Sequence, residues 1–339
     1  LKVLIAKRTK EKFGIELDPQ RNIIINPGSD VGLMFAMAPW INPGDEVILP
    51  EPAFVSYLPC IKLADGVPVT INLKEENQFK LQPEELLAAI TDKTKILILY
   101  EKRLTDKTKM VLLTNPNNPT CVCYTREELE QLAQFCIKNN LICVVDQAFE
   151  DSVFDGKAMT CMAALPGMWE RTVTVCSTSK GMALSGLRVG WIYANDIIMD
   201  AYFGSAVNMQ GATSTLGQLA VMPAFEDDSF IKDYMVKYDN RRKYAYNLFN
   251  AVPGVSMKMP EATCCIWVNV SKLGTSTEIT KYLIDEAKVN VNDGKFYGSM
   301  GEGHLRVVTG CFWDDKDCFD ALDRMADAFR KLGKEKGIA

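Results

Sequence analysis

Residues 177–191 read STSKGMALSGLRVGW, and this stretch joins two short apolar segments at 172–176 and 189–193. It places Lys180 and Arg188 among serine, threonine and glycine residues. Hydroxyl groups and backbone N–H groups in a turn suit an anion, and a plain connector between two buried strands would not require them. We therefore expect an anion-binding turn at the end of a buried strand, with Lys180 inside it.

Ser177-x-x-Lys180 also matches the serine–lysine pair of β-lactamases and penicillin-binding proteins. That chemistry needs the serine at the start of a helix, together with Ser-Asp-Asn and Lys-Thr-Gly motifs. Neither motif occurs in the chain. The acyl-enzyme interpretation is therefore rejected.

Outward from this stretch, short apolar runs alternate with helical patterns over the first two-thirds of the chain. Thr125-Arg-Glu-Glu is a capping box and predicts a helix that runs towards Lys138. This alternation predicts an α/β fold with a mainly parallel, seven-stranded sheet sandwiched by helices, and ligands beyond the carboxyl ends of its strands. The candidate strands are 22–26, 46–49, 67–72, 109–114, 141–145, 172–176 and 189–193.

The pattern changes near residue 227. A long charged helix is expected at 227–249, followed by two or three strands and a terminal helix at 314–334. The prediction is a large domain at 1–226 and a smaller C-terminal α/β domain at 227–339.

A pentapeptide, TDKTK, occurs at 91–95 and again at 105–109, each time before an apolar run. Only one copy can precede a given strand of the sheet, and we assign that place to 109–114. The run at 95–100 is then an extra strand, a loop or a displaced edge, and a tolerated local duplication is the favoured explanation.

Composition narrows the possible partners. The formal net charge is −5, which argues against a nucleic-acid or anionic-membrane surface, and no apolar run approaches the ~20 residues of a membrane span.

Eleven cysteines without a CxxC motif indicate reduced thiols in a cytoplasmic protein, and we expect no metal. The single histidine, His304, weakens every mechanism that depends on imidazole, and we expect it to be structural.

Three more turns carry polar residues after predicted strands. Residues 26–33 (NPGSDVGL) precede a helix whose N-terminal N–H groups suit a phosphate. Residues 115–120 (NPNNPT) contain two prolines that restrict the turn carrying Asn118. Asp146 ends a strand too apolar for the surface, where a carboxylate is costly unless a cation meets it.

Together these four turns resemble the class I/II aminotransferases of fold type I, which depend on pyridoxal 5′-phosphate (PLP). The resemblance covers nearly the whole chain in order. It implies a PLP cofactor, amino transfer from an L-amino acid to a 2-oxo acid, and a homodimer. It also implies that the N-terminal part of the family's large domain, including a substrate-covering loop, lies outside this sequence.

Carried over residue by residue, the resemblance gives Lys180 the Schiff base with the cofactor. It pairs Asp146 with the protonated pyridine nitrogen, and such a pair keeps the ring an electron sink because the carboxylate raises the nitrogen's pKa. Asn118 would hydrogen-bond the ring hydroxyl and contact the substrate, and Arg306 would clamp the substrate carboxylate. The remaining cofactor-binding residues would be Gly28, Ser29 and Asp30, Ser177, Arg188, and Phe54 stacked on the ring.

Two positions depart from the family pattern. Phe149 stands where a tyrosine hydroxyl usually contacts the ring oxygen, and its absence should slow turnover without abolishing it. Cys121 replaces a glycine, so its backbone must avoid positive φ or accept strain. The substrate side chain is not readable from the sequence, and two alternatives stay open: a β-lyase or decarboxylase of the same fold, and a catalytically idle PLP-binding module.

Overall fold

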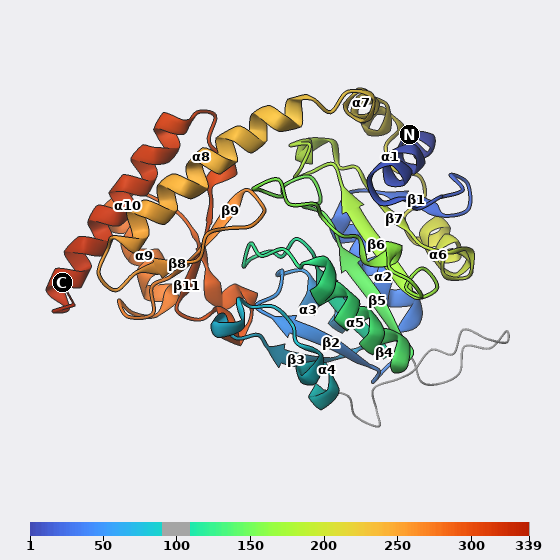
Figure 1. Ribbon diagram of the computed structural model, residues 1–339, viewed down its shortest axis with the longest axis horizontal. Helices are drawn as coiled ribbons and strands as arrows, with labels where there is room; N and C mark the ends of the chain where they lie inside the picture. Colours follow the sequence, from blue (N-terminus) through green and yellow to red (C-terminus); the bar gives the residue numbers. More distant parts are fainter. Residues whose placement is uncertain (90–108, 339) are drawn as a thin grey trace.

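The computed structural model describes residues 1–89 and 109–338, and Figure 1 shows two parts, each built around its own sheet. The larger sheet has seven strands in the order β1-β7-β6-β5-β4-β2-β3. Strands β2 to β6 and β1 run parallel, and β7 alone runs against its neighbours β1 and β6. Its strands are β1 Ile23–Asn26, β2 Glu46–Glu51, β3 Val67–Asn72, β4 Lys109–Thr114, β5 Leu141–Asp146, β6 Thr172–Ser177 and β7 Gly190–Tyr193.

The expected seven-stranded, mainly parallel sheet is therefore confirmed. Strands β3 and β4 begin and end at the predicted residues, and each of the other five strands differs from its prediction by one or two residues at one end. The prediction for the apolar run at 95–100, and nearly all of the repeated pentapeptide, lie outside the described residues. Lys109, the last residue of the second copy, opens β4 as expected.

Helices cover both faces of this sheet because successive strand residues point to opposite sides. Val144 of β5 packs with the helices of one face, and Val145 packs with those of the other. Helices α2 (Ser29–Met37), α3 (Tyr57–Leu63) and α6 (Asp196–Met209) cover the first face. The second face carries α4 (Pro83–Ala89) and α5 (Arg126–Lys138), while α1 (Lys2–Phe13) and α7 (Thr215–Glu226) pack against the β1–β7 edge.

Helix α5 begins as the sequence predicts. The Thr125 side chain accepts a hydrogen bond from the Glu128 N–H, and the Glu128 carboxylate accepts one from the Thr125 N–H. Such reciprocal capping satisfies two N–H groups that the helix itself leaves free. Within the described residues, no helix combines the length and apolarity needed to cross a membrane.

The smaller sheet is antiparallel, with the order β10-β11-β9-β8. The prediction of two or three strands was too low, because β8 and β10 have only two residues each, too short for a visible alternation. The elements of this part are α8 Phe230–Asn250, β8 Ser256–Met257, β9 Cys265–Asn269, α9 Ser276–Ala287, β10 Asn292–Asp293, β11 His304–Val308 and α10 Asp315–Glu335.

Two helix starts in this part lie later than predicted. Helix α8 begins at Phe230 and not near Asp227, since the Asp227 carboxylate accepts a hydrogen bond from the Ser229 N–H and holds a turn there. Helix α10 begins after Asp314, which caps it by accepting from the Asp317 N–H.

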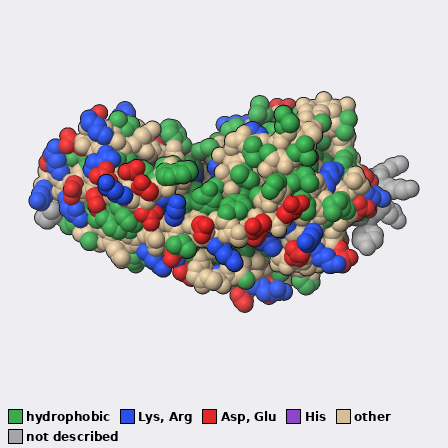
Figure 2. Space-filling view, turned by 90° about the horizontal axis from the view of Figure 1, so that it is seen from above, with side chains coloured by type: hydrophobic (Ala, Val, Ile, Leu, Met, Phe, Trp, Pro, Cys, Tyr) green, Lys and Arg blue, Asp and Glu red, His purple; other side chains and the backbone are tan. Residues whose placement is uncertain are grey.

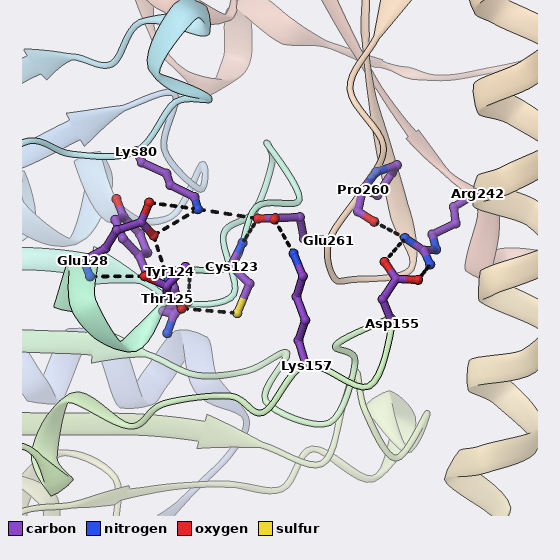
Figure 3. A network of polar contacts seen from close by, with 11 residues as sticks. Lys80, Cys123, Tyr124, Thr125, Glu128, Asp155, Lys157, Arg242, Pro260 and Glu261 are labelled. Atoms are coloured by element: carbon purple, nitrogen blue, oxygen red, sulfur yellow. Dashed lines mark hydrogen bonds and ion pairs between the residues drawn. The ribbon is translucent and has the colours of Figure 1, made fainter.

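The two parts are joined by backbone hydrogen bonds as well as by the chain. Residues 261–263 lie against 152–154, where Phe154 N–H donates to Glu261 O and Thr263 N–H donates to Ser152 O. Figure 3 shows the ion pairs beside this seam, including Lys157–Glu261 at 2.7 Å and Arg242–Asp155 at 2.5 Å. This seam sets how the smaller sheet faces the larger one.

Candidate active site

The polar turns singled out in the sequence meet at one edge of the large sheet, because parallel strands end at the same edge. They surround a small cavity there. Eleven of its lining residues come from the four turns and from the segment after β2, and Thr114 at the end of β4 completes the wall. The eleven are Ser29, Asp30, Phe54, Asn118, Asp146, Ala148, Phe149, Ser179, Lys180, Ser185 and Arg188.

One side of the cavity is an anion cradle made of backbone. Gly28 has φ 88° and precedes α2, whose first turn receives no side-chain capping hydrogen bond from any described residue. A Cβ on Gly190 would lie 2.9 Å from the Ser29 nitrogen, and a Cβ on Gly28 would collide with the Arg188 guanidinium. Only glycine leaves this approach open, so N–H groups and the positive end of the helix face the cavity.

Arg188 lies in the loop between β6 and β7 with a left-handed backbone, φ 51°. Its Nη1 donates to the Ser185 carbonyl at 3.0 Å and its Nη2 to the Pro27 carbonyl at 3.2 Å. Asp30 lies 3.9 Å from Nη2, and its carboxylate accepts from the Ser56 hydroxyl. These contacts hold the guanidinium beside the cradle, where it can add charge to the backbone donors.

Lys180 follows β6 and is half-buried. The turn before it is held by the Ser177 hydroxyl, which accepts from the Ser179 N–H at 3.0 Å, and by the Thr178 hydroxyl, which donates to the Val189 carbonyl at 3.1 Å. Ser177 itself is buried below the cavity lining. The turn therefore presents an amine on a braced backbone.

Asp146, the last residue of β5, is 6% exposed. Its Oδ2 accepts from the Tyr57 hydroxyl at 2.8 Å and its Oδ1 from the Ala148 N–H at 2.9 Å. Burial raises the pKa of Asp146 above its ordinary value, against the lowering effect of these two donors. A cationic ligand in the cavity would remove that penalty, because an opposite charge favours the ionised carboxylate.

Tyr57 was not identified from the sequence. It opens α3, is fully buried, and its hydroxyl links Asp146 to the Thr114 hydroxyl at 2.6 Å. The available signal was its spacing, three residues after Phe54, which puts both aromatic side chains on the same side of a helical turn. A buried carboxylate also requires donors, and tyrosine is one of the residue types that can supply one.

Asn118 is buried, and its side-chain oxygen has no hydrogen-bond partner within 1–89 and 109–338. Such orphaned groups are rare in folded proteins and leave an acceptor for a bound molecule.

Three residues later, Cys121 has φ 63°, so the position that usually carries glycine keeps the left-handed backbone and accepts the strain. Phe149 is buried in the cavity wall, as its place after Asp146 predicts.

Arg306 does not line this cavity. It lies on β11 opposite Trp267, on the face of the small sheet that turns towards the large one. Its Nη1 donates to Asn292 Oδ1 at 3.0 Å, and its buried Nε lacks a partner among the described side chains and backbone. His304 stacks on Trp267 with ring centroids 5.1 Å apart, which agrees with the structural role expected for it.

The cavity matches the three chemical features of PLP. The aldehyde requires an amine, which Lys180 provides, and the phosphate requires the cradle with Arg188. The pyridine nitrogen requires a buried acid, which Asp146 provides. By contrast, no group of three or more His, Cys, Asp or Glu side chains is arranged to hold a metal in the part of the chain that the structure describes. Fold and site together define a PLP-dependent protein of fold type I.

Comparison with known proteins identifies the family. Residues 1–325 match the model of "Aminotransferase class I and II". The aspartate aminotransferase of Pyrococcus abyssi is 30% identical over 98% of this chain and 82% of its own length. The aromatic-amino-acid aminotransferase 2 of Thermococcus litoralis is 30% identical over 100% and 82%.

Among solved structures, an aromatic aminotransferase from Pyrococcus horikoshii superposes with a TM-score of 0.89 at 29% identity, over 100% of this chain and 86% of that one. The chain belongs to the class I and II aminotransferases, and PLP is the cofactor of this family. The prediction of an aminotransferase is confirmed, and the lyase, decarboxylase and idle-module alternatives are not favoured.

Proposed function

We propose that this enzyme moves the amino group of an L-amino acid to a 2-oxo acid, with Lys180 as the residue that bonds to the cofactor. The observation that carries the proposal is the single cavity that holds the Lys180 amine, the buried Asp146 carboxylate and the anion cradle at Gly28 and Arg188. When bound, PLP supplies an electron sink for the pair of electrons left at the substrate Cα.

Each side chain has a separate task in this proposal. Asp146 holds a proton at the ring nitrogen, and Tyr57 keeps the carboxylate oriented through its 2.8 Å hydrogen bond. Once the substrate has displaced it, the Lys180 Nζ acts as the base that removes the proton from Cα, a contribution typically worth 10²–10⁴-fold. Ser29, Asp30 through its backbone N–H, and Arg188 line the cavity and bind the phosphate together with the neighbouring Gly28, and Phe54 stacks on the ring. Ser177, expected from the resemblance to bind the phosphate, does not line the cavity, and its hydroxyl accepts from the Ser179 N–H instead.

Arg306 is the proposed clamp for the substrate α-carboxylate. Its buried Nε has no partner among the described residues, and a carboxylate can be bound by two parallel N–H groups of arginine. Asn118 is proposed to contact both cofactor and substrate, because it lines the cavity and its side-chain oxygen has no partner among the described residues.

The test uses the enzyme loaded with PLP. Borohydride reduction followed by peptide mapping should place the label on Lys180, and a panel of amino acids should release 2-oxo acids in the presence of a second 2-oxo acid. Label on another lysine would refute the assignment of Lys180. Release of ammonia without amino transfer would refute transamination.

We also propose a homodimer formed through α6 and α7. Val207 and Met209 at the end of α6 and Leu216 and Leu219 in α7 are 57–81% exposed, and such apolar groups mark an interface. Seen from above the view of Figure 1, hydrophobic side chains gather over the large part of the molecule (Figure 2). Light scattering should give a dimer mass, and Leu216→Glu should yield monomer, whereas Ile284→Glu on α9 should not.

The domain division at 1–226 and 227–339 is proposed because the two parts have separate hydrophobic cores. One core lies between the large sheet and its helices, and the other is formed by residues of α8 and the elements that follow it. Limited proteolysis, which should cut between the two domains, tests this division.

A cytoplasmic location is proposed because all eleven cysteines are free thiols, which a reducing compartment preserves. Fractionation of the producing cells tests this location.

A further inference from the structure

The loop at 294–301, between β10 and β11, contacts both Arg306 and the segment that carries Phe54. It consists of two short 3-10 turns. Its first and last residues lie against each other, because a Cβ on Gly294 would collide with the Gly301 carbonyl and a Cβ on Gly301 with the Gly294 carbonyl. Only glycine permits this approach, so the two ends of the loop are closed on each other.

Within the small part, Tyr297 of this loop lies beside Arg306. The Arg306 Cζ atom is 5.9 Å from the centroid of the Tyr297 ring, within the range of a cation–π contact. The Tyr297 hydroxyl donates to Asn292 Oδ1 at 3.4 Å, and the same oxygen accepts from Arg306 Nη1 at 3.0 Å. One side-chain oxygen therefore holds the hydroxyl and the guanidinium together.

Trp267 supports the Tyr297 ring. It stands opposite Arg306 in the β9–β11 pair, and its ring meets the Tyr297 ring edge to face, with centroids 5.7 Å apart and an interplanar angle of 83°. This is a favoured arrangement of two aromatic rings. Because Tyr297 is only 5% exposed, its ring is fixed in place next to the guanidinium.

The same loop is bonded to the segment that follows β2 in the large part. The Tyr297 carbonyl accepts from the Ala53 N–H at 2.8 Å. The Ser299 N–H and hydroxyl both donate to Glu51 Oε2, at 3.0 and 3.2 Å. Phe54, the next residue after Ala53, lines the cavity. The loop is therefore a second junction between the two parts, separate from the seam described above.

We propose that Tyr297 is a positioning residue for substrate binding, which fixes the Arg306 guanidinium relative to the cofactor cavity. Its side chain lies against the guanidinium and shares a hydrogen-bond acceptor with it, and its backbone is bonded to the residue before Phe54. One residue thus holds the carboxylate clamp to the residue that stacks on the cofactor ring. The inference rests on the proposed role of Arg306.

The first test removes single groups from this arrangement. Tyr297→Phe keeps the ring and the backbone bond to Ala53 and loses only the hydroxyl. We expect the KM for the amino acid to rise about three- to tenfold, the range of one lost hydrogen bond, with kcat and PLP affinity unchanged. Asn292→Ala, which removes the shared acceptor, should raise the KM by a similar factor.

Tyr282→Phe is the matched control in the same part of the molecule. Tyr282 lies on α9, and its hydroxyl has no hydrogen-bond partner among the described residues. Its substitution should change neither the KM nor kcat nor the affinity for PLP.

The decisive measurement repeats Tyr297→Phe in the Arg306→Gln enzyme. If the hydroxyl acts through the guanidinium, its loss raises the KM of the unsubstituted enzyme and has no further effect in the Arg306→Gln enzyme. A merely structural residue would weaken both enzymes by the same factor. Steady-state kinetics of the four PLP-loaded enzymes with one amino acid give this comparison, and their melting temperatures report any loss of folding.

An unchanged KM in Tyr297→Phe, or an equal rise with and without Arg306→Gln, would overturn the inference, as would a fall in kcat or PLP affinity in place of the change in KM. If Arg306→Gln itself had no effect, the clamp and this inference would fail together, and the labelling of Lys180 would still stand. If Tyr297→Phe folded poorly, Asn292→Ala, at an exposed side chain, would carry the same comparison.

Discussion

The two arginines proposed to bind anions are held in different ways. Arg188 sits in a left-handed loop of the large part, its side chain is 50% exposed, and two backbone carbonyls accept from its Nη atoms. Arg306 sits on a regular strand of the small part, is half-buried, and donates to the Asn292 side chain.

The difference separates cofactor binding from substrate binding. The place of Arg188 follows from the large part alone, since the residues it touches, Pro27, Gly28 and Ser185, all belong to turns at the edge of the large sheet. The distance of Arg306 from Lys180 depends on how the small sheet packs on the large one, through the seam at 261–263. We therefore expect substitutions in the large part to change PLP affinity and kcat, and substitutions in the small part to change the KM for the amino acid.

The largest effect on amino transfer should come from removing the Lys180 amine. Lys180→Ala should abolish amino transfer, because it removes both the covalent attachment of the cofactor and the base at Cα. Borohydride should no longer fix the cofactor to the protein. Lys7→Ala, at an exposed lysine of α1, is the matched control and should behave like the unsubstituted enzyme. Residual transamination at more than about one hundredth of the normal rate would contradict the role of Lys180.

The second-largest effect should come from removing the charge of Asp146. Asp146→Asn keeps the size of the side chain but loses the charge that holds a proton on the ring nitrogen, and kcat should fall by about 10²-fold or more. The rate of amino transfer and the visible spectrum measure this. Asp320→Asn, at an exposed aspartate, should leave both unchanged.

The same variant should also change how the stability of the apoprotein depends on pH. The pKa of Asp146 is raised in the folded, cofactor-free protein, so the folded state binds this proton more tightly than the unfolded state does. Stability is therefore lost as the pH rises from the ordinary aspartate pKa through the raised one. Asp146→Asn should remove that loss, and apoprotein melting curves at several pH values should show a smaller decline. An unchanged decline would contradict the assignment.

Substitutions of the two arginines should have effects of intermediate size, one on the KM for the amino acid and the other on the affinity for PLP. Arg306→Gln should raise the KM for the amino acid by about 10–100-fold, the range of one or two lost charge-assisted hydrogen bonds, with little change in PLP affinity. Arg188→Gln should weaken PLP binding by a similar factor. Titrations of cofactor and substrate measure the two constants. If both variants weakened both ligands equally, the separation of the two regions would be wrong.

The smallest effect should come from the tyrosine that orients Asp146. Tyr57→Phe removes one hydrogen bond to the carboxylate, and we expect a several-fold fall in kcat and a loss of about 1 kcal/mol in stability. Tyr124→Phe is the matched control, because Tyr124 is also buried but does not line the cavity, and its hydroxyl accepts from the Leu81 N–H. It should lose stability alone. Equal kinetics in the two variants would assign Tyr57 a purely structural role.

Much of the large part could be predicted from the chain because its signals are local. The strands at 67–72 and 109–114 are short apolar runs between turn residues, and the capping box at Thr125 needs only two side chains three residues apart. The small part was harder. Strands of two residues carry no alternation, and they form here only because longer neighbours pair with them.

By itself, the sequence determined which residue types follow each strand: a lysine among hydroxyls after β6, an aspartate after the apolar run of β5, and a glycine before α2. These features depend on neighbours along the chain, and so they were visible in it. The tertiary structure alone decided that the Tyr57 hydroxyl reaches Asp146, that Arg306 stands on a separate sheet outside the cavity, and that Cys121 touches Cys265. Such contacts join residues 89 or more positions apart, and the register of two sheets packed across a seam sets them.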